Sequence, residues 1–315
     1  VILPLLIYYL SLRLKGSIMC GIVGLFAKTK EFEKELGKYF SGMLNEMTDR
    51  GPDSAGCAIY HNVTKASELK IVAMSETPLS KNKLLERIRQ PYPDASVQEL
   101  ESLHFLITLE GPSKEAILEL HKCFPNLKIL SSGSSIEIYK AEGLPKNVLE
   151  KFSISSMNGS HALGHTRMAT ESAITTAHSH PFSTGDDLCL VHNGSLSNHN
   201  RLRAKLQKEG IYFSSDNDSE VAAGYLAWRI KQGKTIEEAL NHALEDLDGF
   251  YTFAIGTKDG FAVLRDPIAC KPAVISETDH WVAMASEYRA IALLPGAQSA
   301  PAWEPAPGKI YSWSH

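Results

Sequence analysis

The sequence has few cysteines, little net charge and no long hydrophobic run, and each shortage argues against a class of protein. Its 315 residues include only five cysteines, an odd number with no Cys-x-x-Cys pair. This count argues against a disulfide framework and a structural zinc site, and it favours a reducing cytoplasm in which most cysteines are small core residues. The formal net charge of -4 leaves no excess of basic residues for binding nucleic acid or a membrane surface.

The longest apolar run stands at the N-terminus, where residues 1–10 are VILPLLIYYL. A membrane-spanning helix needs about 20 apolar residues, so this run is too short. A signal peptide would carry positive charge before the run, whereas Arg13 and Lys15 follow it, and Met19 is too large for the position before a lipoprotein cleavage site. We therefore expect residues 1–18 to be a removable leader or a wrongly assigned start, with translation beginning at Met19.

The remaining composition is that of an ordinary globular protein, with 43% hydrophobic and 22% charged residues. A chain of this length can bury a large core as one large domain or two small ones. Strand-like and helix-like segments are mixed without regular alternation, which predicts an α+β protein with two sheets layered with helices. The expected strands are 21–26, 54–60, 69–75, 160–166, 188–192, 251–256, 261–265, 273–276 and 281–285, and the expected helices are 31–49, 198–209, 218–232 and 235–247.

Residues 78–150 differ in character from the rest of the chain. They contain strand-like segments at 103–109, 127–130 and 136–139 and a helix-like segment at 114–122. These segments could form a small α/β unit of the βαββ type, inserted into a main domain that spans 19–315. No chemical motif lies in this unit, so a role in regulation or partner contact is only a hypothesis.

The tripeptide Met19-Cys20-Gly21 is the first candidate for chemistry. Methionine before a small residue is readily removed, which would leave Cys20 with both a thiol and a free α-amine. A thiol reacts as its thiolate, and an α-amine has a reference pKa of about 7.7–8.0, which suits a general base. One residue would then supply both nucleophile and base. The alternative is a buried structural cysteine at the start of a strand, and the tripeptide alone favours that alternative.

Two further segments carry groups that can bind a carboxylate or an oxyanion. Arg167 follows a strand, and its guanidinium can form two parallel hydrogen bonds with a carboxylate, with Thr170 as a further hydroxyl; the alternative is an ordinary surface arginine. Asn193 and Gly194 also follow an apolar strand. An Asn-Gly step is typical of a hairpin turn, which the spacing alone favours, but it can also direct an amide side chain and a backbone N–H at one oxyanion.

Other polar segments are ambiguous by themselves. Asp218 opens an expected helix and could cap it, or it could receive an ammonium group. Arg50 begins the segment Arg-Gly-Pro-Asp-Ser-Ala-Gly, which indicates a turn after a helix. His178 and His180 fit one face of a strand, but no Cys, Asp or Glu stands at a recognisable ligand spacing, so we expect no metal site.

The order of these segments is more specific than any one of them. Met-Cys-Gly-Ile-Val-Gly, Arg-Gly-Pro-Asp-Ser-Ala-Gly, Gly-His-Thr-Arg-x-Ala-Thr, His-Asn-Gly and Asp-Ser-Glu follow one another as in the class II (N-terminal nucleophile) glutamine amidotransferase domain, which this chain resembles. The resemblance covers 19–77 and 155–292. Segments 166–172 and 191–200 are most similar to the stand-alone amidotransferase subunit of the N-methylglutamate synthase and glutamate synthase-like group.

The resemblance implies a fold and a mechanism. The fold would be the four-layer αββα sandwich of the N-terminal nucleophile (Ntn) hydrolases, and no cofactor or metal is implied. Cys20 would attack the side-chain amide of glutamine and form a γ-glutamyl thioester, which makes the protein a glutaminase. The implied roles of the other residues are the oxyanion hole for Asn193 and Gly194, the α-carboxylate site for Arg167 and Thr170, the α-ammonium site for Asp218, and support of the nucleophile for Arg50.

Two departures from the family concern the glutamine pocket. Many relatives have Trp where this chain has Met168, so the pocket wall would differ. Relatives of the sugar-phosphate type have His-Gly where this chain has Glu171-Ser172. A glutamate beside a carboxylate-binding site would repel the substrate unless it pointed away.

The residues after 292 are too few for a flavin or sugar-phosphate domain. We therefore expect ammonia to pass to a separate synthase subunit, a glutamate synthase-type flavoprotein with ammonia or methylamine chemistry at its own site. Two alternatives stay open. A hydrolase of the same fold could cleave γ-glutamyl amides other than glutamine, and the chain could be a non-catalytic regulatory subunit if residues 1–18 are retained and the amine of Cys20 stays blocked.

Overall fold

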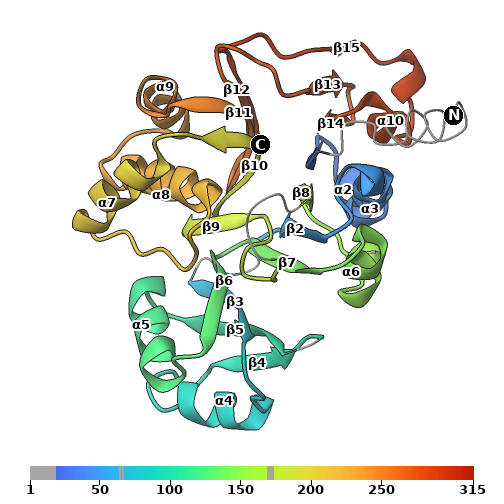
Figure 1. Ribbon diagram of the computed structural model, residues 1–315. Helices are drawn as coiled ribbons and strands as arrows, with labels where there is room; N and C mark the ends of the chain where they lie inside the picture. The colour runs from blue at the N-terminus through green and yellow to red at the C-terminus, as the bar shows by residue number, and fades with distance from the viewer. Residues whose placement is uncertain (1–18, 64, 66, 102, 169–173) are drawn as a thin grey trace, which may run out of the picture.

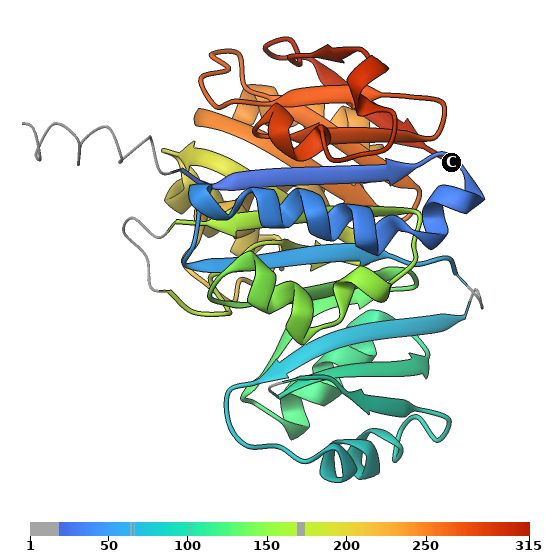
Figure 2. The ribbon, with the colours of Figure 1, turned by 90° about the vertical axis from the view of Figure 1, so that its right-hand side faces the viewer.

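The computed structural model describes residues 19–315, except for residues 64, 66, 102 and 169–173. Two sheets lie face to face in the main body, and helices cover the outer side of each sheet (Figures 1 and 2). This four-layer arrangement confirms the α+β αββα sandwich expected from the sequence. Within the described ranges, no helix combines the length and the apolar character needed to cross a membrane.

The first sheet has seven strands, all paired antiparallel. The strands are β1 (Gly21–Ala27), β2 (Ser54–Tyr60), β7 (Ile136–Glu142), β8 (His161–Arg167), β13 (Val274–Glu277), β14 (Trp281–Ala285) and β15 (Ala302–Trp303). Their order across the sheet is β15-β13-β14-β1-β8-β2-β7, which places β1 in the centre. Its outer side carries α2 (Lys30–Lys34), α3 (Leu36–Glu46), α6 (Pro145–Lys151) and α10 (Tyr288–Ile291), with the 3-10 turns η1 (Thr48–Arg50), η2 (Ile154–Ser156) and η3 (Ala297–Ser299).

The second sheet has five strands and faces the inner side of the first. Its strands are β9 (Phe182–Gly185), β10 (Leu188–Leu196), β11 (Gly249–Thr257), β12 (Gly260–Arg265) and β16 (Ile310–Ser314), in the order β16-β12-β11-β10-β9. The outer helices are α7 (His199–Lys208), α8 (Asp218–Lys231) and α9 (Ile236–Asp246), which confirm the three expected helices of this region. A capping box between Thr235 and Glu238 begins α9.

The burial of β1 explains why its sequence is apolar at nearly every position. Val23 and Leu25 pack against the helices of the outer layer, whereas Ile22 and Phe26 face the second sheet. A strand buried on both faces is expected to be a continuous apolar run rather than an alternating one. The residue that precedes this strand, Cys20, therefore stands at the end of a rigid central element.

The helix expected at 31–49 is interrupted in the structure. Glu35 has φ -105° and ψ 6°, which ends α2 and begins α3, and the last residues form η1. The three-and-four spacing still decides the buried side, because Phe40, Met43 and Leu44 are fully buried against the first sheet. After α3 ends at Glu46, η1 brings Arg50 to the end of the sandwich where Cys20 lies.

A small α/β unit with a core of its own lies against the main body, below it in Figure 1. It contains β3 (Glu68–Ser75), α4 (Lys81–Ile88), β4 (Ser96–Glu99), β5 (His104–Glu110), α5 (Ser113–Cys123) and β6 (Leu127–Gly133), with the sheet order β4-β5-β3-β6. These boundaries differ from the expected insertion at 78–150. The unit begins at Glu68, while residues 136–151 belong to the main body because β7 pairs with β2 along its whole length.

Candidate functional site

Cys20 lies directly before β1, and its position depends on the glycine that follows it. A Cβ atom on Gly21 would lie 2.8 Å from Thr166 Oγ1 and 2.9 Å from Met47 Cβ, so a side chain there would push β1 away from its neighbours. The β1–β8 register pairs Gly21 with Thr166, which brings Cys20 next to Arg167 at the end of β8. The thiol of Cys20 is half-buried, with Sγ 3.9 Å from the Met168 carbonyl oxygen.

Two side chains from separate elements donate hydrogen bonds to the carbonyl oxygen of Cys20. Arg50 Nε in η1 and Asn193 Nδ2 in β10 each lie 3.1 Å from that oxygen. Arg50 is itself fixed by Glu287, whose Oε1 lies 2.6 Å from Nη1, and Glu287 Oε2 lies 2.8 Å from Arg289 Nε. The carbonyl of Cys20 is therefore held by a charged donor from the outer layer of the first sheet and by an amide from the second sheet.

Asn193 and Gly194 lie within strand β10 and do not form a hairpin turn. They pair with Thr252 and Tyr251 of β11, so the turn that the Asn-Gly spacing favours is wrong. Gly194 has φ +150°, and a Cβ atom there would lie 2.0 Å from the Phe250 carbonyl oxygen. Only glycine suits this backbone conformation. The strand thus directs the Asn193 amide toward Cys20 and keeps the backbone beside it without a side chain.

The residues implied to bind substrate lie at the ends of elements that meet near Cys20. Arg167 is the last residue of β8 and is buried. Thr170 and the departure at Glu171-Ser172 fall within 169–173, outside the described residues, so the role implied for Thr170 stays a prediction. Asp218 begins α8, and its Oδ2 accepts a hydrogen bond of 2.9 Å from the backbone N–H of Leu196 in β10.

The cap of α8 differs from the expected one. Asn217 is the N-cap, and its side chain accepts a hydrogen bond of 2.8 Å from Ser219 N. Asp218 therefore does not cap the helix, and its carboxylate instead ties α8 to β10. His192 in β10 strengthens the same junction through a contact of 2.8 Å between its Nδ1 and Ser219 Oγ.

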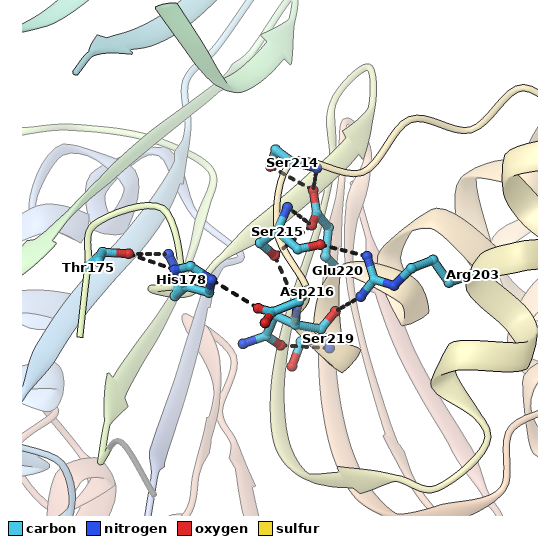
Figure 3. A network of polar contacts seen from close by, with 9 residues as sticks. Thr175, His178, Arg203, Ser214, Ser215, Asp216, Ser219 and Glu220 are labelled. Carbon is cyan, nitrogen blue, oxygen red and sulfur yellow. Dashed lines mark hydrogen bonds and ion pairs between the residues drawn. The ribbon is translucent and has the colours of Figure 1, made fainter. Parts of the chain in front are cut away.

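A polar network holds the loop that leads into Asp218 (Figure 3). The Glu220 carboxylate accepts hydrogen bonds of 2.6–2.8 Å from the backbone and hydroxyl groups of Ser214 and Ser215. His178 Nε2 lies 3.0 Å from Asp216 Oδ1, a contact drawn in Figure 3 that joins this loop to the segment before β9. In the described part of the chain, no group of three or more His, Cys, Asp or Glu side chains could hold a metal ion.

Burial and nearby positive charges have opposite effects on the pKa of the Cys20 thiol. Burial raises the pKa of the Cys20 thiol above its ordinary value, while the positive charges of Arg167 and Lys271 act in the opposite direction. Burial also lowers the pKa of His192 behind Asn193, so a neutral imidazole is favoured there. The site therefore combines a partly desolvated thiol with several fixed positive charges.

Two residues near the site had no assigned role in the sequence analysis, Glu287 and Lys271. Glu287 anchors Arg50, and Lys271 Nζ lies 3.6 Å from Met19 Sδ. Glu287 follows β14 of the first sheet and Lys271 follows β12 of the second, and both are far from Cys20 in the sequence. The sequence predicted a strand before each of them, but no local pattern indicated that either side chain would lie near Cys20.

Comparison with known proteins links this geometry to one group. A family model described as a glutamine amidotransferase domain matches residues 165–293. The chain is 51% identical over 300 residues to the glutamine amidotransferase-like protein GlxB of Rhizobium meliloti, covering 94% of this chain and 99% of that protein. It is also 31% identical over 281 residues to a protein of Methanothermobacter thermautotrophicus that is provisionally named a glutamine amidotransferase, covering 85% of this chain and 92% of that protein.

The fold has a counterpart among solved structures. Glutamine phosphoribosylpyrophosphate amidotransferase from B. subtilis superposes with a TM-score of 0.60 at 19% identity, covering 94% of this chain and 47% of that one. At this level of identity the likeness concerns the fold alone. It agrees with the two facing sheets and their outer helices.

Proposed function

The chain belongs to the class II glutamine amidotransferase family, an amide-hydrolysing group, and from this premise we propose that it hydrolyses glutamine through Cys20 as an N-terminal nucleophile. The observation that carries the proposal is the convergence on Cys20 of Arg50, Asn193 and Arg167 from three separate elements. Removal of the residues before Cys20 would release its α-amine. That amine would then accept the thiol proton, directly or through a water molecule.

The proposed reaction has two halves. The thiolate of Cys20 attacks the side-chain carbonyl carbon of glutamine, the C–N bond breaks, and ammonia leaves with a proton returned by the α-amine. Water then attacks the γ-glutamyl thioester, which releases glutamate and restores the thiol. Both steps pass through a tetrahedral intermediate with a negatively charged oxygen, which needs fixed hydrogen-bond donors.

Asn193 and Gly194 are suited to the role of oxyanion donors. The Asn193 amide has two N–H bonds, and one of them is used by the Cys20 carbonyl oxygen. The second N–H and the backbone N–H of Gly194 are the proposed donors to the oxyanion. Loss of one such donor typically raises the barrier by about 2.7–4 kcal/mol.

The proposed substrate pocket binds the two charged ends of glutamine separately. The Arg167 guanidinium would bind the α-carboxylate, with Thr170 as a further donor, and Asp218 would bind the α-ammonium group. Asp218 already accepts one hydrogen bond at Oδ2, from Leu196 N. A carboxylate has about four lone-pair sites, so Asp218 can accept an ammonium group without losing this bond.

We place the acceptor of the ammonia on a separate synthase subunit, of the glutamate synthase-type flavoprotein class that includes N-methylglutamate synthase. The Rhizobium relative supports a stand-alone arrangement, since the shared region covers 99% of its length. A reducing cytoplasm suits an enzyme whose nucleophile is a free thiol. Co-expression with a candidate synthase should give one complex on size exclusion, and full activity of the isolated chain with no such complex would count against this assignment.

The central test compares wild type with Cys20→Ala and with Cys270→Ala, which removes an exposed cysteine outside the proposed site. Intact mass first establishes that each protein starts at residue 20. Glutamate and ammonia release should be lost in Cys20→Ala and retained in Cys270→Ala, with unchanged unfolding temperatures. Undiminished ammonia release from Cys20→Ala, or turnover by a chain that retains residues before Cys20, would refute the mechanism. A panel of γ-glutamyl amides run beside glutamine identifies the preferred substrate.

A further inference from the structure

Lys271 is a half-buried cation whose side chain points to Met19, the residue directly before the start of the proposed mature chain. Its Nζ lies 3.6 Å from Met19 Sδ, and Met19 is joined directly to the nitrogen of Cys20. The same ammonium lies 5.1 Å from the centroid of the Phe250 ring. Among the described residues, no carboxylate forms an ion pair with it. The side chain of Lys271 is therefore held near the start of β1 by a sulfur and an aromatic ring rather than by a carboxylate.

The backbone that carries Lys271 is held by several buried groups. Asp266 is fully buried and accepts hydrogen bonds from Tyr251 N, Ile268 N and Ala269 N at 2.7–3.1 Å. Arg265 donates to the Lys271 carbonyl oxygen at 3.0 Å and also to the carbonyl of Ala269.

Ala269 adopts φ +53°, a left-handed conformation that a non-glycine residue takes only when its surroundings enforce it. The turn therefore gives Lys271 a defined direction. The hydrogen bonds that hold this turn at Lys271 come from Arg265 and Thr252, and both are donated to the backbone carbonyl oxygen of Lys271. They do not involve its side chain. Replacement of the side chain should leave the turn intact.

The other charged groups around Cys20 are already matched or would be matched by substrate. Arg50, from η1, donates to the Cys20 carbonyl oxygen and is paired with Glu287 next to α10. Arg167, from β8, is assigned to the α-carboxylate of glutamine under the proposed function. His192, from β10, is buried and favours the neutral form. Asp218, from α8, lies 3.9 Å from His192 and is assigned to the α-ammonium group under the proposed function. Among the described residues, Lys271 is then a positive charge near the nucleophile that forms no ion pair.

We infer that Lys271 is a positioning residue that keeps a positive charge beside the N-terminal Cys20 and thereby favours the deprotonated states of its thiol and α-amine. The inference rests on the proposed role of Cys20. A nearby positive charge disfavours an ammonium group and favours a thiolate, so both effects extend activity to lower pH. Removing the charge should move the acidic limb of Cys20 reactivity to higher pH by about 0.5–1 unit, because the site is only partly desolvated.

The experiment measures the alkylation of Cys20 by iodoacetamide as a function of pH. A removable tag placed directly before Cys20 gives every variant the same mature start. The modification is followed on the Cys20 peptide by mass spectrometry, because Cys123 and Cys270 are also accessible. The variants are Lys271→Met, Lys271→Arg and the matched control Lys309→Met, whose ammonium also lies 5.1 Å from an aromatic ring, that of Tyr311.

Lys271→Met should shift the alkylation profile to higher pH and slow the reaction about three- to ten-fold below the limb. Lys271→Arg, which keeps the charge, and Lys309→Met should follow the wild type. A Lys271→Met profile that superposes on the wild type would overturn the inference. Alkylation does not require glutamine turnover, so this result is independent of the comparison with Cys20→Ala, which tests the proposed function by itself.

Discussion

Arg50→Lys tests whether the guanidinium beside the Cys20 backbone holds the nucleophile in place. Arg50 bridges two partners, the Cys20 carbonyl oxygen at 3.1 Å and Glu287 Oε1 at 2.6 Å. A lysine ammonium is a single point charge and cannot reproduce both contacts of the planar fork. The variant keeps the positive charge, so it removes the geometry and leaves the net charge unchanged.

The size of the effect follows from the lost hydrogen bond. A hydrogen bond from a charged donor contributes about 1.5–3 kcal/mol, and Arg50 is almost wholly buried, so solvent cannot replace it. If this contribution serves to position Cys20, the barrier rises by a similar amount and kcat falls about ten- to hundred-fold. KM should change little, because the proposed contacts to glutamine come from Arg167 and Asp218.

The assay is steady-state glutamate release by protein that starts at Cys20, with kcat and KM determined separately and the unfolding temperature recorded. Arg289→Lys is the matched control, since Arg289 contacts the same Glu287 at 2.8 Å but makes no contact with Cys20. Its kcat should stay within about twofold of wild type, as expected for a half-exposed ion pair. A kcat for Arg50→Lys that is also within twofold, in a folded and correctly processed protein, would refute the reasoning.

Two further predictions concern stability. Asp187→Asn should lower the free energy of unfolding by about 2–4 kcal/mol, because its carboxylate accepts hydrogen bonds from the backbone N–H groups of residues 134–136 at 2.8–3.0 Å; denaturant midpoints equal to those of the exposed control Asp279→Asn would contradict this. Glu137→Gln should flatten the acid dependence of stability. Burial acts to raise the pKa of Glu137, but contacts with His61 and Lys70 lower it to about 2. Its carboxylate therefore stabilises the fold above the unfolded pKa of about 4.3, and this contribution is lost as the pH falls toward 2. Unfolding temperatures at pH 7, 4 and 2.5 should fall more steeply for wild type than for Glu137→Gln, and parallel curves would count against the assignment.

Several elements followed from local sequence because their own side chains decide them. The apolar run after Cys20 predicted a buried strand, and β1 is buried along its whole length. The helices α7, α8 and α9 appear where the sequence predicted helices at 198–209, 218–232 and 235–247. In these cases the residues of one segment determine both its secondary structure and the side of it that is buried.

Other features depended on distant partners. The Asn193-Gly194 step looks locally like a turn, but eight paired positions between β10 and β11 keep it inside a strand. β4 consists of Ser-Val-Gln-Glu, and only its pairing with β5 makes it a strand. The free energy of strand pairing depends on residues in another segment. A local pattern therefore does not reveal it, and these two features were missed or misinterpreted.

By itself, the sequence determined the residue types and their order: a cysteine after a removable methionine, an arginine after one strand, an Asn-Gly pair in another and an aspartate at a helix start. The tertiary structure decided which of these groups meet. It bound Arg50 and Asn193 to the same carbonyl oxygen and turned Lys271 toward Met19. The physical reason is that hydrogen bonds and charges act through space, and only the packing of the two sheets sets the distances between residues far apart in the chain.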